Sequence, residues 1–143
     1  MILLNIKKKI AHLKSTYETN NPFDLAKFLG IFILYEELGS IKGYYNKQLR
    51  LKQIHINCNL NRHEMQFTCA HELGHAVLHP NENTQFLRNN TLLSVDKLEI
   101  EANKFAIELL LPDEILNEYK EYSIEQLSRL LGYNEKLIEL RIK

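Results

Sequence analysis

The helix that organises this chain contains the segment Thr68-Cys69-Ala70-His71-Glu72-Leu73-Gly74-His75. His71 and His75 are four residues apart, so on an α-helix their side chains lie on the same face and can converge on one metal ion. Zinc is the usual occupant of such a site. Glu72 follows the first histidine directly and is placed to take a proton from a water on the metal, not to bind the metal itself. The segment therefore predicts a hydrolytic zinc site.

The surroundings of the two histidines favour a buried helix over a helix that carries them on its surface. A fixed His-Glu-x-x-His arises by chance in roughly 3% of sequences of this composition, so the motif alone does not decide the matter. Buried histidines need partners, and apolar residues flank the motif on more than one side: Ala70, Leu73, Ala76 and Val77. Gly74 costs about 0.5–1 kcal/mol relative to Ala inside a helix. The close approach of another backbone would explain that cost, and a merely tolerated glycine is the alternative.

A zinc site of this kind needs a third protein ligand and an open position for water. His79 lies four residues beyond His75, but three histidines on one straight helix would span about 12 Å, too far for one ion. We therefore interpret His79 as a residue at the helix end or one that supports a ligand. Glu99 and Glu101, beside the apolar residues of the next predicted helix, are better candidates, although solvent exposure is the simpler interpretation of either acid alone. Asn103, one turn beyond Glu99, can hydrogen-bond a ligand histidine.

The periodicity of apolar residues predicts an α+β fold that is mainly helical. Helices are expected at 5–18, 23–29 and 62–78, from Ser94 or Asp96 to Leu111, and as two short C-terminal helices. Asn21 is the expected N-cap of the second helix, with Pro22 at its first position. Near the C-terminus, Ser123 and Gln126 have the spacing of a capping box, and Gly132 is placed as a helix stop.

Three short segments predict a small β-sheet. Residues 31–35 form an apolar run of strand length, Tyr44 and Tyr45 fall in a second strand, and residues 53–57 alternate between apolar and polar. We expect an antiparallel sheet of three or four strands, because the connections are too short for helical crossovers.

Length, charge and composition exclude several classes of protein. The chain has 143 residues, 18 Lys and Arg against 18 Asp and Glu, 45% hydrophobic residues and only two cysteines. Its length predicts one domain over 1–143. Zero net charge argues against direct nucleic-acid binding, and the C-terminal helix–Gly–helix segment lacks the basic residues of a recognition helix.

The sequence also predicts where in the cell the protein is located. The sequence has no apolar run long enough to span a membrane and no signal peptide, so we expect a cytoplasmic protein. Cys58 and Cys69 are then expected to be reduced and structural.

Several motifs, in order, resemble the ImmA/IrrE family of zinc metallopeptidases over about residues 15–115. Besides residues 68–75, the resemblance rests on residues 20–31, 54–57 and 109–112, and on Glu99, Glu101, Ala102, Asn103, Phe105 and Ala106. It implies a compact, intracellular, zincin-like domain with a gluzincin-like zinc site. The catalytic core is then expected at about 15–115, with C-terminal helices at 113–143 packed on it. Such proteins are encoded in phages, integrative elements and stress-response loci, and characterised members cleave a helix-turn-helix repressor to relieve repression.

The resemblance also implies roles for single residues. Related zinc peptidases take their third ligand from the first Glu of a Glu-x-x-Ala-Asp/Asn pattern, which falls on Glu99, while the final Asn, here Asn103, supports a histidine. Glu101 remains an alternative, since the family often carries both acids. Nothing in the pattern identifies the group that stabilises the oxyanion; the candidates are Tyr44, Tyr45, His55 and His63.

The leading hypothesis is a zinc endopeptidase that cleaves a helix-turn-helix repressor of a phage or mobile element. His71, His75 and Glu99 would hold Zn²⁺, and Glu72 would act as the general base. The polar residues 81–90 are a candidate rim of the cleft. The alternative is a zinc-containing anti-repressor that acts by protein contact with little hydrolysis, although an intact Glu72 argues against it.

Overall fold

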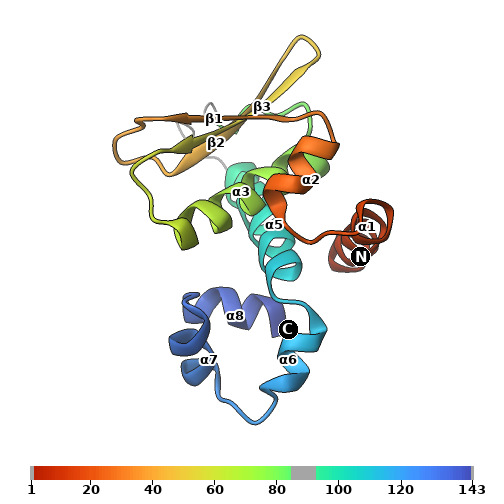
Figure 1. Ribbon diagram of the computed structural model, residues 1–143, viewed down its shortest axis with the longest axis vertical. Coiled ribbons are helices and arrows are strands. Elements are labelled where there is room, and N and C mark those ends of the chain that lie inside the picture. Colours follow the sequence, from red (N-terminus) through yellow and green to blue (C-terminus); the bar gives the residue numbers. More distant parts are fainter. Residues whose placement is uncertain (1, 85–92, 143) are drawn as a thin grey trace.

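Helix α3 (Arg62–Leu78) lies between a small sheet and helix α5 (Leu93–Leu110), and it contacts both (Figure 1). The computed structural model describes residues 2–84 and 93–142, and within them the side chains of residues 5–84 and 97–142. The other elements are α1 (Ile2–Tyr17), α2 (Pro22–Phe28), β1 (Phe32–Glu36), β2 (Gly43–Gln48), β3 (Leu51–Asn57), α6 (Asp113–Glu118), α7 (Ile124–Leu131) and α8 (Glu135–Ile142). The predicted α+β class is confirmed.

Local signals fix both ends of α3. Asn61 and Glu64 form a capping box, in which the Asn61 side chain accepts from the Glu64 N–H at 2.8 Å and the Glu64 carboxylate accepts from the Asn61 N–H at 3.3 Å. The helix ends at Leu78, and Pro80 follows. The predicted bounds of 62–78 are therefore confirmed to the residue.

At Gly74, α3 and α5 approach each other closely. A Cβ added there would lie 3.0 Å from the Cβ of Phe105 and 3.2 Å from the Cα and the carbonyl oxygen of Ala102. These atoms belong to the backbone or to the stem of a side chain, so they cannot rotate away. The predicted close approach of another backbone is confirmed. This contact sets α5 against the histidine-bearing face of α3.

The sheet has the strand order β1-β3-β2, with β2 and β3 antiparallel and β1 and β3 parallel. The expectation of an antiparallel sheet is therefore wrong for β1. That expectation assumed that a parallel pair needs a helical crossover, whereas here the crossover between β1 and β3 contains β2 itself. A tight turn joins β2 to β3, with Leu49 at φ 59°, and it leaves the other edge of β3 for β1.

One apolar core joins the sheet to the helices. On the face of the sheet towards α3, Tyr45, Ile54 and Ile56 are fully buried. The core continues into α1, α2, α3 and α5, with Ile6, Leu25, Leu73 and Phe105 among its fully buried members. The histidine helix is thus held on two sides by apolar contacts.

The predicted caps of the smaller helices are confirmed. Asn21 accepts from the N–H groups of Phe23 and Asp24, and Pro22 is the first residue of α2. Ser123 and Gln126 form the predicted capping box of α7, and Gly132 ends that helix in the left-handed conformation. Helix α5 begins at Leu93, before the predicted caps Ser94 and Asp96, whose side chains lie outside the described residues.

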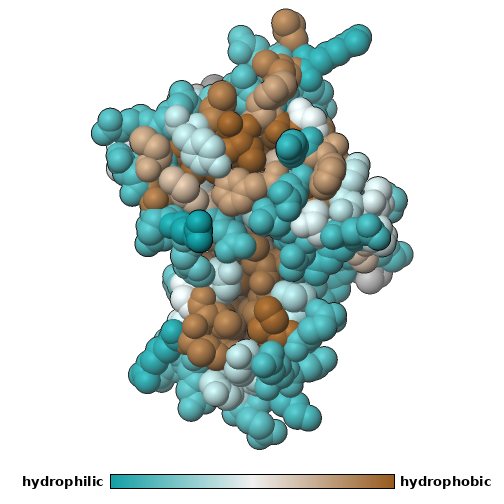
Figure 2. All heavy atoms as spheres, in the orientation of Figure 1, coloured by the Kyte–Doolittle hydropathy of each residue, from teal (hydrophilic) through white to brown (hydrophobic). Residues whose placement is uncertain are grey.

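The C-terminal helices α6, α7 and α8 lie at the opposite end of the molecule from the sheet (Figure 1). Figure 2 shows apolar side chains gathered among them, and Leu127 and Ile138 are buried there. Helix α8 contacts α5, and its buried Arg141 donates to the Leu111 carbonyl oxygen at 2.7 Å and pairs with Glu108 of α5. Lys7 of α1 pairs with the same Glu108. No helix among the described residues is long and apolar enough to cross a membrane.

Candidate metal centre

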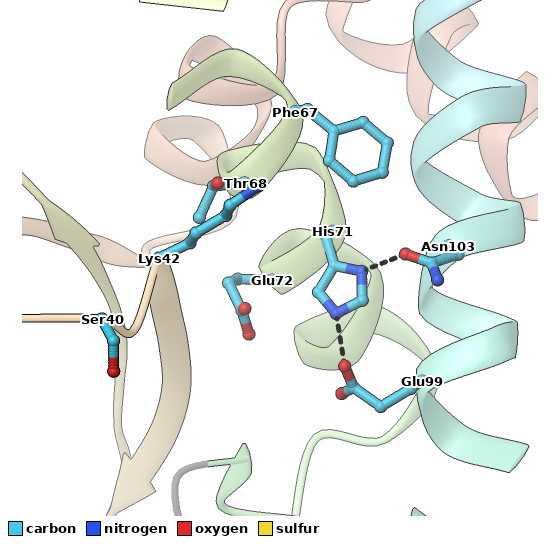
Figure 3. Close-up of a pocket in the computed structure, with 8 residues that line it drawn as sticks. All are labelled: Ser40, Lys42, Phe67, Thr68, His71, Glu72, Glu99 and Asn103. Atoms are coloured by element: carbon cyan, nitrogen blue, oxygen red, sulfur yellow. Dashed lines mark hydrogen bonds and ion pairs between the residues drawn. The ribbon is translucent and has the colours of Figure 1, made fainter. Parts of the chain in front are cut away.

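His71 and His75 project from α3 towards α5, and the carboxylate of Glu99 lies between their Nε2 atoms. The distances are 3.2 Å from His71 Nε2 to Glu99 Oε2 and 2.7 Å from His75 Nε2 to Glu99 Oε1. Ligand atoms of His71, Glu72 and His75 lie within 4.8 Å of one another. The structure thus brings both imidazoles and two carboxylates into one small volume, and Figure 3 shows His71, Glu72 and Glu99 of this group.

The site is buried at its base and open on one side. His75 and Glu72 are fully buried and His71 is 7% exposed, whereas the Glu99 side chain is 30% exposed. A cavity of about 350 Å³ opens beside them, lined by Ser40, Lys42, Phe67, Thr68, His71, Glu72, Glu99 and Asn103 (Figure 3). A water or a peptide group can therefore reach the point on which the imidazoles converge.

The charges of the site suit a cation. Burial raises the pKa of Glu99, but hydrogen bonds from His71 and His75 outweigh it and hold the pKa well below its usual range. Burial lowers the pKa of His71, but its hydrogen bond to Glu99 and the nearby carboxylates raise it overall. For His75 burial prevails, and its pKa is lowered. An ionised carboxylate between two imidazoles is a donor set that fits a divalent metal ion.

Asn103 holds His71 in place from α5. Its Oδ1 lies 2.7 Å from His71 Nδ1, so the amide oxygen accepts a hydrogen bond from the ring and leaves Nε2 to face Glu99. Glu99 and Asn103 are one turn apart, which is why both reach the same imidazole. The contact that the sequence predicted for Asn103 is present.

The two candidate acids point to different histidines. Glu101 lies against His79, with 2.7 Å between Glu101 Oε1 and His79 Nε2, and it is 9% exposed. Glu99 alone of the two contacts the Nε2 atoms of His71 and His75. The geometry therefore favours Glu99 as the third ligand.

Glu72 is joined to the sheet through Thr84, a residue that the sequence analysis missed. The Thr84 hydroxyl is fully buried and lies 3.2 Å from Glu72 Oε1, 2.5 Å from the Tyr45 nitrogen and 3.1 Å from the Tyr45 carbonyl oxygen. Thr84 belongs to no sequence motif, so its contact with Glu72 becomes visible only in the fold. Of the predicted rim at 81–90, residues 85–90 lie outside the described residues.

The four residues considered for the oxyanion are engaged elsewhere. Tyr44 and His55 stack on each other, with ring centroids 4.2 Å apart. Along their strands they alternate with Tyr45, Ile54 and Ile56, the fully buried residues that face α3, so they lie on the other face of the sheet. The Tyr45 hydroxyl and the His63 ring each donate to a backbone carbonyl oxygen. The cavity wall instead carries Lys42 and Ser40, which the connection between β1 and β2 brings to the site.

The two cysteines are unpaired. Cys69 is fully buried, and burial together with the nearby Glu72 raises the pKa of its thiol, which keeps it protonated. That agrees with a structural role for Cys69. Cys58 is exposed.

Comparison with known proteins identifies the family. The model of the IrrE N-terminal-like domain, a peptidase family, matches residues 26–143. The chain is 44% identical over 139 residues to "Uncharacterized immunity region protein 2" of Bacillus phage phi105, covering 95% of this chain and 88% of that protein. It is 38% identical over 117 residues to "Metallopeptidase ImmA" of Bacillus subtilis (strain 168), covering 82% of this chain and 69% of that protein. The chain therefore belongs to the ImmA/IrrE family of metallopeptidases, hydrolases that depend on a metal ion.

Proposed function

We propose that this protein is an intracellular zinc endopeptidase whose metal is held by His71, His75 and Glu99. The observation that carries the proposal is the convergence of both Nε2 atoms on Glu99 beside an open cavity. Two imidazoles and one carboxylate form a ligand set that catalytic zinc sites use, with a further position open for water. The single domain expected over 1–143 is part of the proposal, supported by the contacts of α8 with α5.

Zinc bound there would act as a Lewis acid, which would polarise the scissile carbonyl and lower the pKa of the attacking water towards neutrality. Glu72 takes the proton of the attacking water and returns it to the leaving amine. Its carboxylate is fully buried and held near Thr84, so its position is fixed before the substrate arrives. Asn103 keeps the His71 ring oriented through the reaction.

The substrate that we propose is a helix-turn-helix repressor of a phage or mobile element. The names of the relatives, an immunity region protein and a metallopeptidase called ImmA, support that choice. The balanced charge of this chain supports a protein that acts on a DNA-binding partner without binding DNA itself.

The test is incubation of the purified, zinc-loaded protein with a candidate helix-turn-helix repressor, chosen from the genes that neighbour this one. We expect repressor fragments with the wild type, about one zinc per chain, and no fragments with Glu72→Gln although zinc is retained. Binding without fragments, together with equal derepression by Glu72→Gln in cells, would instead support the anti-repressor that acts by contact. Cleavage at the wild-type rate by Glu72→Gln would remove Glu72 from the mechanism.

A further inference from the structure

A buried series of hydrogen bonds begins at His75 Nδ1, on the opposite side of the ring from the Nε2 atom that faces Glu99. His75 Nδ1 lies 3.1 Å from His79 Nδ1, and His79 Nε2 lies 2.7 Å from Glu101 Oε1. The three residues are buried, with exposed fractions of 0% for His75, 8% for His79 and 9% for Glu101. His79 is the C-cap of α3, and its N–H donates to the His75 carbonyl oxygen at 2.7 Å, which fixes it one turn beyond His75.

The donors and acceptors in this series of hydrogen bonds can be assigned by starting from Glu101. An ionised carboxylate only accepts, so His79 donates to Glu101 from Nε2. A neutral imidazole that donates from one nitrogen accepts at the other, so His79 Nδ1 accepts from the Nδ1–H of His75. His75 then carries its lone pair on Nε2, the atom that lies 2.7 Å from Glu99 Oε1.

The two imidazoles of the site therefore have different supports. The amide oxygen of Asn103 accepts directly from His71, from the same helix that carries Glu99. His75 has a histidine as its acceptor, and a histidine can also donate from that nitrogen. The contact with Glu101 makes His79 an acceptor at Nδ1. Glu101 therefore has a function although its carboxylate contacts His79 and not the Nε2 atoms of His71 and His75.

We propose that His79 and Glu101 are positioning residues for His75, with Glu101 fixing the tautomer of His79 and His79 fixing the tautomer and ring direction of His75. The inference rests on the proposed function, since it takes His75 as a metal ligand. It assigns Glu101 a role through His79 rather than as the third ligand. Removing such a support from a ligand histidine weakens metal binding by about 10- to 100-fold.

The experiment measures the zinc affinity of the purified protein by competition with a chromophoric chelator at neutral pH. His79→Phe keeps a ring but has no acceptor, and Glu101→Ala releases the His79 tautomer; we expect each to bind zinc about 10- to 100-fold more weakly. His79→Asn supplies an amide oxygen as acceptor, and Glu101→Gln still accepts from His79. The zinc affinities of both variants should stay within about threefold of the wild-type value, well short of the 10- to 100-fold loss.

A matched control separates support of His75 from loss of stability. Glu108→Ala removes another buried acid of α5, which pairs with Lys7 and Arg141 and lies nine residues, about 14 Å along the helix, beyond Glu99. It should lower the free energy of unfolding and leave zinc affinity unchanged. ¹⁵N NMR of the zinc-loaded wild type should show His75 protonated at Nδ1 and His79 protonated at Nε2.

The outcomes distinguish this inference from the proposed function. A wild type that binds no zinc overturns both. A zinc-binding wild type with His79→Phe and Glu101→Ala at wild-type affinity, or with His79→Asn as weak as His79→Phe, overturns the positioning role alone. If His79→Phe does not fold by circular dichroism, the two Glu101 variants decide: equal zinc affinity in Glu101→Ala and Glu101→Gln refutes the inference.

Discussion

Replacing Gly74 with Ala should both destabilise the protein and weaken its metal site, because the new methyl group lies where α3 meets α5. Its Cβ would be 3.0 Å from Phe105 Cβ and 3.2 Å from two backbone atoms of Ala102, so α5 must move by a few tenths of an ångström. Overpacking of this kind costs about 1–3 kcal/mol. The better helix propensity of Ala offsets about 1 kcal/mol of it. The expected net loss in the free energy of unfolding is about 1 kcal/mol, within a range of about 0–2 kcal/mol.

The movement of α5 matters for the site because Glu99 and Asn103 are on that helix and contact histidines of α3. Metal–ligand distances tolerate only about ±0.2 Å, so zinc affinity should fall together with stability. Urea unfolding of the metal-free protein gives the free energy of unfolding, and chelator competition gives the zinc affinity. Ala11→Gly, at an exposed position of α1, measures the effect of helix propensity on stability where no tight contact is involved. A gain of about 1 kcal/mol with unchanged zinc affinity would refute the proposed tight contact.

Further predictions concern the residues around the metal. Glu99→Ala should lose zinc under conditions in which Glu101→Ala keeps it with reduced affinity, as measured by metal analysis after dialysis; metal loss only in the Glu101 variant would reverse our assignment. Asn103→Ala should weaken zinc binding by about 10- to 100-fold, whereas Asn103→Asp, which still offers an acceptor to His71, should not. Without metal, the lowered pKa of Glu99 contributes stability that is complete above its ordinary value of 4.5 and is lost as the pH falls through the lowered value. Glu99→Gln should therefore flatten the acid side of the stability profile in urea titrations, and an unchanged profile would contradict that role.

Sequence reasoning succeeded where the determinants are local. The capping box of Asn61 and Glu64 and the proline after His79 fix α3, so its bounds were predictable. The spacing of His71 and His75 predicted their shared face for the same reason.

The residue pattern was misleading for the pairing of β1, and it left other features undecided, where the determinants are contacts between distant segments. The parallel pairing of β1 with β3 depends on β2 occupying the other edge, which no local pattern encodes. Glu99 and Glu101 differ by two positions on one helix, so only the rotation of α5 about its axis, set at Gly74, decides which of them faces the imidazoles. Thr84, Ser40 and Lys42 reach the site from other elements and belong to no motif.

The pairing of Lys7 and Arg141 with Glu108 has a practical consequence for work on this protein. Both ends of the described chain are attached to α5, nine residues, or about 14 Å along the helix, from Glu99. A truncation that removes Arg141 would leave the Leu111 carbonyl oxygen without that donor and Glu108 with Lys7 alone. Affinity tags or deletions at either terminus therefore act on the stability of α5, the helix that carries Glu99. Free energies of unfolding are therefore comparable between preparations only when both termini are the same.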